Sequence, residues 1–162
     1  MPEKCYCEEQ YNITRLTLLT HLNIAGHNFI SDLSPLIKLQ YLVFGGYKSC
    51  ISDNGIMKLT NLTQLNIGDN PLISTLSYFP KLINFRAEYC LSTPLFDISK
   101  FYKLRTLTLL DYPSGHIPIS YILSLTNLTE LNIDWKFAYQ NWKLICSLPS
   151  LIYLNGKSNF KF

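Results

Sequence analysis

Apolar residues recur along this chain in one pattern, which appears seven times. Each copy follows the form L-x-x-L-x-L, where other apolar residues, and once Gly, replace some of the leucines. The first and last copies begin 132 residues apart over six intervals, so the mean period is 22 residues. A fixed period of about 20 to 29 residues predicts stacked repeats rather than one closed core. The copies, here called units 1 to 7, begin at Leu19, Leu39, Leu62, Leu82, Leu104, Leu128 and Leu151.

Each unit combines two hydrophobic periods. Leu62, Leu65 and Ile67 of unit 3 alternate with polar residues, as in a short strand with one buried face. Ahead of each motif the apolar period becomes three, as at Leu76 and Phe79, which is typical of a 3₁₀ turn or an extended left-handed segment. No single unit of this length can bury its own apolar edges, but stacked units bury them jointly. We therefore expect parallel strands on the concave face of an arc and return segments on its convex face.

Two stretches carry a resemblance to a known family. NFISDLSPLIKLQYL (Asn28 to Leu42) and ISDNGIMKLTNLTQLNIGDN (Ile51 to Asn70) resemble the short leucine-rich repeats of internalins and phosphatase regulators. The resemblance implies an α/β fold, a right-handed leucine-rich-repeat solenoid, and a non-catalytic scaffold that binds other proteins. We expect a single domain over residues 1–162, in which 1–12 cover the first unit, 13–159 form the seven repeats and 160–162 form a tail.

The ninth position of each unit departs from the family pattern. It is ordinarily Asn or Cys, whose side chain satisfies backbone groups at the turn that follows the strand. Only Asn70, Cys90 and Asn159 conform. Either water and neighbours such as Asn28 replace this side chain elsewhere, or several of the turns bulge. The other units have His27, Tyr47, Tyr112 and Lys136 at this position.

The candidate binding surface follows from the outward positions of the units. Positions seven and eight form two adjacent rows at the ends of the strands, where acidic residues mix with aromatic ones, and aromatic side chains are favoured at binding hot spots. We expect this strip to bind a basic or amphipathic protein segment, although Asp69 and Asp111 also suit a purely structural role in turns. The candidate partner-binding residues are Asp69, Glu88, Tyr89, Leu110, Asp111, Asp134 and Trp135 at the strand ends, with Tyr41, Arg86 and Glu130 on the concave face.

The opposite edge of the predicted sheet carries several lysines. Lys38, Lys81 and Lys103 share the position before the first leucine of their units, with Lys58 and Lys100 nearby. We interpret this row as a solvated edge, because no aromatic platform for a nucleic acid accompanies it.

Composition narrows the remaining choices. The net charge is only +3, so we expect no nucleic-acid partner. The polar start of the chain resembles no signal peptide and no apolar run is long enough to cross a bilayer, so we expect no membrane association and a cytoplasmic location, with delivery into a host cell if the source is a microbe or virus. Five cysteines, an odd number, weakly favour a reducing compartment, and Cys5 and Cys7 lack a second pair for a zinc site.

No convergent set of nucleophile, base or phosphate-binding glycines appears in the sequence. We therefore expect neither an enzyme nor a cofactor, and a monomer when the chain is free. Two other hypotheses stay open. The chain is a structural subunit of a larger assembly such as a virion or cilium, or it is the regulatory or substrate-reading arm of an enzyme complex.

Overall fold

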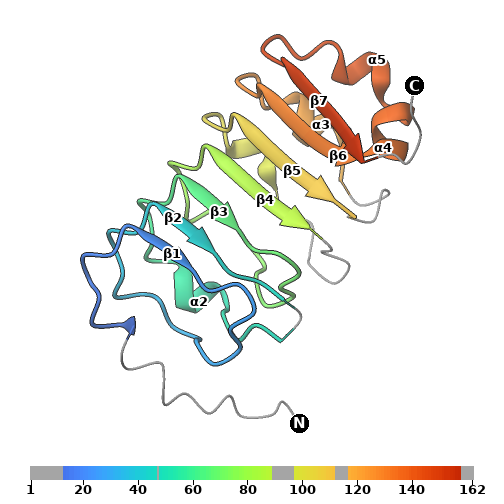
Figure 1. Cartoon of the computed structure of the whole chain (residues 1–162). Helices are drawn as coiled ribbons and strands as arrows, with labels where there is room; N and C mark the ends of the chain where they lie inside the picture. The colour runs from blue at the N-terminus through green and yellow to red at the C-terminus, as the bar shows by residue number, and fades with distance from the viewer. Residues whose placement is uncertain (1–12, 47, 89–96, 112–116, 158–162) are drawn as a thin grey trace.

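The computed structural model describes residues 13–46, 48–88, 97–111 and 117–157. Within them, seven short parallel strands form one open sheet in the order of the chain (Figure 1). The leucine-rich-repeat solenoid predicted from the sequence is confirmed. The strands are β1 (His21–Asn23), β2 (Tyr41–Val43), β3 (Gln64–Asn66), β4 (Asn84–Glu88), β5 (Thr106–Leu110), β6 (Glu130–Asp134) and β7 (Tyr153–Lys157).

The strands stack in the register of the repeat. Position three of each unit faces position three of the next, from His21 through Asn84 to Tyr153. The carbonyl oxygen at position two accepts two backbone N–H groups from the next unit, as at Thr63, which accepts from Ile83 at 2.8 Å and Asn84 at 3.0 Å. The same pair of bonds recurs between every two neighbouring strands. Every unit therefore places its side chains in the same direction as its neighbours.

The return segments follow the period of three. In unit 3 the N–H of Leu59 donates to the carbonyl of Ile56 at 2.9 Å, and that of Leu62 donates to Leu59 at 3.0 Å. Each apolar residue thus bonds to the apolar residue three positions earlier, as in a 3₁₀ turn. Four return segments also contain a short helix: α2 (Asp53–Ile56), η1 (Ile98–Lys100), α3 (Ile119–Leu123) and α5 (Trp142–Ile145).

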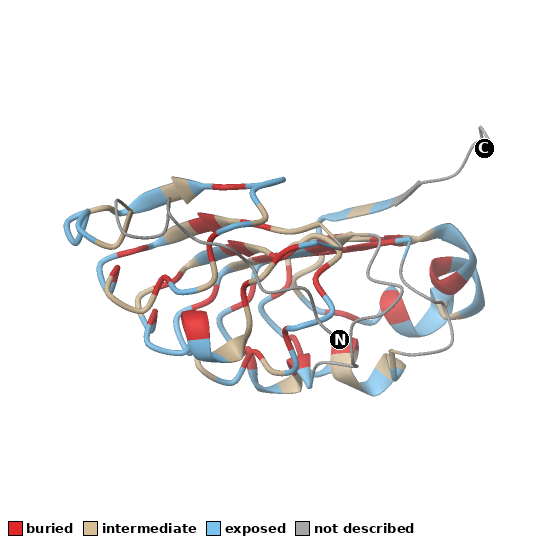
Figure 2. Ribbon diagram, turned by 90° about the horizontal axis from the view of Figure 1, so that it is seen from below, coloured by how far each residue is buried: buried red, intermediate tan, exposed pale blue. Residues whose placement is uncertain are grey.

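The core is a continuous row of apolar side chains between the sheet and the return segments (Figure 2). In the central units, Leu62, Leu82 and Leu104 are at most 1% exposed. At the two ends the equivalent Leu19 and Leu151 are only partly buried, because each end unit has a neighbour on one side only.

Asn70 shows how the ninth position works when the family residue is present. The side chain is fully buried, and its Nδ2 donates to the Ser49 Oγ at 3.2 Å and to the Ile51 carbonyl at 2.9 Å. Its Oδ1 accepts the N–H of Leu72 at 2.9 Å. Asn70 therefore ties its own turn to the preceding unit. Tyr47, Cys90, Tyr112 and Asn159 lie outside the described residues.

Replacing Asn70 with Ala should lower the free energy of unfolding by about 2 kcal/mol, since the Ile51 carbonyl and the Leu72 N–H lose the buried side chain that bonds to them. Asn61→Ala serves as the control, because Asn61 is only partly buried although its Nδ2 also bonds to a neighbouring carbonyl, that of Ile37. We expect that control to lose less than about 1 kcal/mol in urea denaturation. Equal losses would show that the buried hydrogen bonds of Asn70 contribute no more to the free energy of unfolding than the partly exposed ones of Asn61.

Candidate functional site

A groove runs across the concave face of the sheet, from β2 to β6. Its volume is about 290 Å³ and it is open to solvent. The stacked register lines up positions three and five of five neighbouring units along it, and these positions are mostly polar. The side chains that line it from these positions are Tyr41, Val43, Gln64, Asn66, Asn84, Arg86, Thr106, Thr108, Glu130 and Asn132.

Several groove residues already bond to one another. The Arg86 guanidinium lies 2.8 Å from a carboxylate oxygen of Glu88, and their side chains are 52% and 17% exposed. Nδ2 of Asn132 donates to Glu130 at 2.9 Å and to the Thr108 hydroxyl at 3.3 Å. Arg86 is therefore paired with a carboxylate at the end of β4, outside the lining of the groove. Its surface consists mainly of amides and hydroxyls that are held in place.

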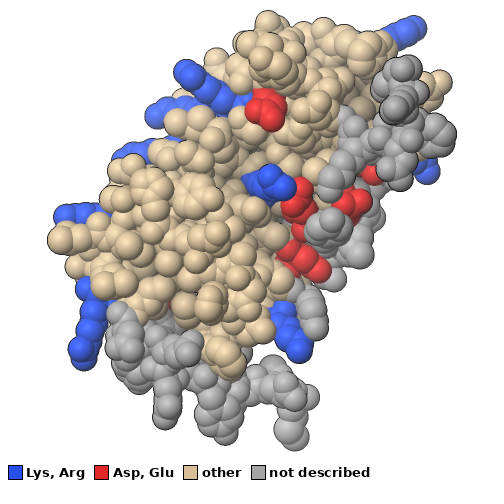
Figure 3. Space-filling model, in the orientation of Figure 1, with Lys and Arg blue, Asp and Glu red and all other residues tan. Residues whose placement is uncertain are grey.

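The predicted acidic strip lies at the carboxyl ends of the strands. Figure 3 shows Asp and Glu side chains gathered there, with Lys and Arg along the opposite edge of the sheet. Two of the predicted residues have local structural roles. Asp134 accepts the N–H of Lys136 at 2.9 Å and caps helix α4 (Trp135–Gln140), and Asp111 adopts a left-handed backbone with a φ of 54°.

The remaining strip residues differ in their exposure. Trp135, the first residue of α4, is 44% exposed, and Oδ1 of Asp69 is buried with no hydrogen-bond partner among the residues that the structure describes. The prediction of an outward contact at Leu110 is wrong, because Leu110 is only 7% exposed. Burial of a large aliphatic side chain lowers the free energy of the folded state, which favours a buried position for Leu110. Tyr89 lies outside the described residues.

Sequence reasoning missed an exposed aromatic surface at the last units. Tyr139 and Trp142 are 76% and 56% exposed on α4 and α5, beside Trp135 in the sequence. The sequence does contain a signal for helix α4. Asp134 is a good helix N-cap residue, and the run that follows it lacks Gly and Pro, which predicts a helix in place of the usual turn. This helix also accounts for the departure at the ninth position of unit 6, because Lys136 belongs to α4.

The described part of the chain contains neither a membrane-spanning helix nor a cluster of metal-binding side chains. No helix there is long and apolar enough to cross a membrane. In the same residues, no group of three or more His, Cys, Asp or Glu side chains is placed to hold a metal ion.

Asp134→Ala should lower the free energy of unfolding by about 1 kcal/mol, because it removes the side-chain acceptor that caps α4. Asp134→Ser retains a capping oxygen without the charge and should keep most of the stability. Chemical denaturation of the two variants measures the difference. If both variants lose the same stability, the cap is not the reason for Asp at this position.

The comparisons with known proteins agree with this geometry. No protein-family model and no curated protein matches the sequence. Among solved structures, an internalin from Listeria monocytogenes superposes with a TM-score of 0.60 at 26% identity, covering 88% of this chain and 42% of its own. Internalin C2 of the same bacterium superposes with a TM-score of 0.55 at 20% identity, covering 90% of this chain and 74% of its own. The chain thus spans less than half of the first internalin, and it is a leucine-rich-repeat protein that resembles the internalins.

Proposed function

We propose that the chain is a non-catalytic recognition scaffold that binds a protein or peptide segment along the concave groove and the adjacent strand ends. The observation that carries the proposal is the groove itself, which crosses five neighbouring strands and is lined by polar, partly exposed side chains in register. The similarity to internalin repeats supports an interaction scaffold in general, whereas the identity of the partner is not tested by it.

The groove suits an elongated partner. Strands lie about 4.8 Å apart, so four intervals give a floor on the order of 19 Å long. A segment that lies across the strands meets a hydrogen-bonding side chain at each step, such as Gln64, Asn84 and Thr106. One end of the groove adds Tyr41, whose ring stacks on His21 with the centroids 5.7 Å apart. Pre-positioned polar groups and aromatic rings are what a segment-binding surface requires.

The charge of the partner is a further part of the proposal. Glu88, Asp111 and Asp134 lie at the carboxyl ends of adjacent strands, which favours a segment with basic residues on that side. Because Arg86 already pairs with Glu88, the attraction on that side depends mainly on Asp111 and Asp134. We expect the free chain to be a monomer.

A groove-blocking variant tests this function. In Asn84→Arg combined with Thr106→Arg, two long charged side chains fill the centre of the groove. The matched control carries Ser77→Arg and Ser120→Arg, which add the same charge at exposed convex positions. Affinity capture from native lysate with mass spectrometry should lose the partner for the groove variant only, at an unchanged thermal midpoint. Retention of the same partners by the groove variant would contradict the proposal.

The strand-end aromatic residues provide a separate test. Trp135→Ala together with Tyr89→Ala should abolish capture of the partner while it leaves the thermal midpoint nearly unchanged, since Trp135 is exposed rather than part of the core. Unaltered capture by this double variant would remove the strand-end strip from the binding surface.

One observation favours the alternative of a structural subunit. Several large apolar side chains are exposed in the last two units, and exposed apolar surface of this kind can serve as a contact site. Size-exclusion chromatography separates the two functions, because a recognition module runs as a monomer whereas an assembly subunit associates. The exposed residues are Tyr139, Trp142, Leu144, Ile152 and Tyr153.

The location of the chain stays a prediction. The sequence favours the cytoplasm over a compartment in which disulfide bonds form. Fractionation of the source cells with a tagged chain would decide between the two.

A further inference from the structure

The turns that lead into the strands form an edge of the sheet that carries cations and no carboxylate. Glu130, the first residue of β6, lies just beyond this edge and lines the concave groove. In each unit this edge consists of five residues, which are the three before the unit's first leucine, that leucine itself and the residue after it. None of these seven segments contains Asp or Glu, whereas Lys38, Lys81, Lys103 and Arg105 all lie in them. The segments are residues 16–20, 36–40, 59–63, 79–83, 101–105, 125–129 and 148–152.

The four cations are exposed, and their charges are not neutralised within the fold. Among the described residues, no ion pair involves any of them. Lys81 donates to an uncharged group, Oδ1 of Asn61, at 2.6 Å. Lys100 differs, since it lies 3.7 Å from Asp97, whose pKa is lowered chiefly by a hydrogen bond from the Ser99 hydroxyl. Lys100 is therefore left out of the surface that follows.

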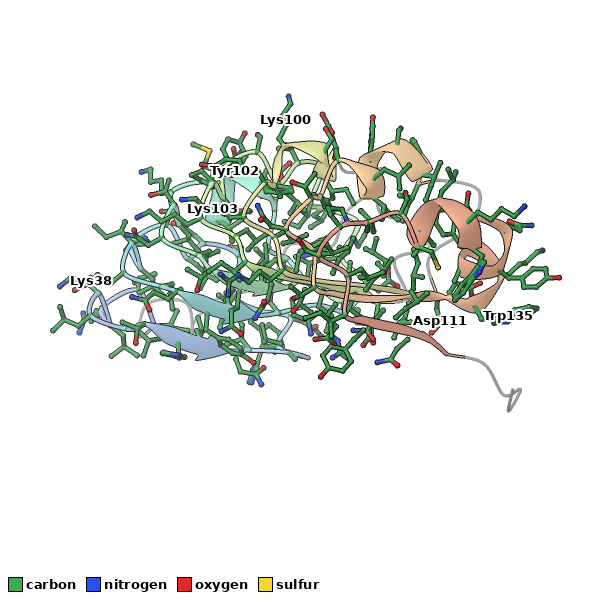
Figure 4. The ribbon with its side chains drawn as sticks, turned by 90° about the horizontal axis from the view of Figure 1, so that it is seen from above. Lys38, Lys100, Tyr102, Lys103, Asp111 and Trp135 are labelled. Atoms are coloured by element: carbon green, nitrogen blue, oxygen red, sulfur yellow. The ribbon has the colours of Figure 1, made fainter. Side chains whose placement is uncertain are left out.

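Exposed apolar side chains lie between these cations. Tyr102 is 61% exposed, and its ring centroid lies 5.6 Å from the Lys103 Nζ. Ile37 and Ile83 are 53% and 36% exposed at neighbouring positions of the same edge. The interpretation of this edge as merely solvated rested on the lack of an aromatic residue, and Tyr102 removes that reason. Figure 4 shows Lys38, Tyr102 and Lys103 on the side of the sheet away from Asp111 and Trp135.

The register places these residues in one short row. Units 4 and 5 are adjacent, so Lys81 and Lys103 lie about 5 Å apart along the stack at the backbone, and Lys38 lies about 10 Å beyond Lys81. Ile83 and Arg105 occupy position two of the same two units. We call Lys38, Lys81, Ile83, Tyr102, Lys103 and Arg105 the amino-edge surface.

We propose that the amino-edge surface binds an acidic, amphipathic protein segment, separately from the concave groove. Charge complementarity requires an anionic partner, and the interleaved Ile83 and Tyr102 require apolar side chains to cover them. Acidic and aliphatic residues within one segment supply both.

Two other anionic partners fit the surface less well. A single-stranded nucleic acid offers phosphates but no cover for aliphatic side chains, and its binding sites stack successive bases on several rings where this edge has Tyr102 alone among the described residues. A membrane surface favours an amphipathic helix with a protruding apolar face, whereas this edge is built from turns.

The test uses a labelled synthetic peptide of alternating Glu and Leu residues, about eight residues long, which spans the row at about 3.3 Å per residue. The variant carries Lys81→Ser and Lys103→Ser, and the repeat tolerates Ser there because unit 7 has Ser150 at the same position. The matched control carries Lys136→Ser and Lys143→Ser, two exposed lysines on α4 and α5. Fluorescence anisotropy measures the dissociation constant, and backbone amide NMR shifts locate the peptide.

We expect the dissociation constant to rise about tenfold for the amino-edge variant and to change by less than about twofold for the control. The peptide should perturb amide signals near Ile83 and Tyr102, and binding should weaken as salt is added. Absence of binding by the wild-type chain, equal weakening in both variants, or shifts confined to the concave face would each overturn the proposal. It would also be overturned if single-stranded oligouridylate or phosphatidylserine vesicles, but not the peptide, bound in a way that depended on Lys81 and Lys103.

Discussion

The structure depends on one constraint, which is that each unit buries its apolar edge only against its neighbours. Leucines such as Leu62 and Leu107 are buried because the neighbouring unit places apolar side chains at the same level of the core. The doubly bonded carbonyl at position two, as at Thr63, fixes the same register at each step. Because register and burial are set together, the outward positions also fall into rows. The surfaces available for binding are therefore consequences of the packing that stabilises the solenoid.

This constraint gives the molecule two edges and one face of different chemistry. Between the edges lies the concave face, whose groove is lined mainly by amides and hydroxyls and contains Arg86, which pairs with Glu88 at the end of β4. Carboxylates gather at the carboxyl ends of the strands and cations at the amino ends (Figure 3). A recognition scaffold gains from such a separation, because a partner of the wrong charge is repelled at either edge.

Much of the fold was predictable because the spacing of the leucines defines the repeat. The spacing predicted the seven strands and their register, and for the return segments it left open a 3₁₀ turn or an extended segment. Local exceptions were harder to predict, since they depend on single residues. Helix α4 follows from the Asp134 cap, and the period-two pattern did not predict the burial of Leu110. Tyr102 was missed as a surface residue because its position before Lys103 belongs to a turn, where the sequence pattern does not assign a direction.

The stacked register is tested most directly by cross-linking across two neighbouring strands. Asn84 and Thr106 are register partners, so cysteines at these positions have Cα atoms about 5 Å apart, within the range for a disulfide bond. The account predicts that Asn84→Cys with Thr106→Cys forms the bond on mild oxidation, identified by peptide mapping. The pair Asn84→Cys with Thr108→Cys, which is offset by two residues, should not form it. Efficient bond formation by the offset pair, and none by the register pair, would contradict the account.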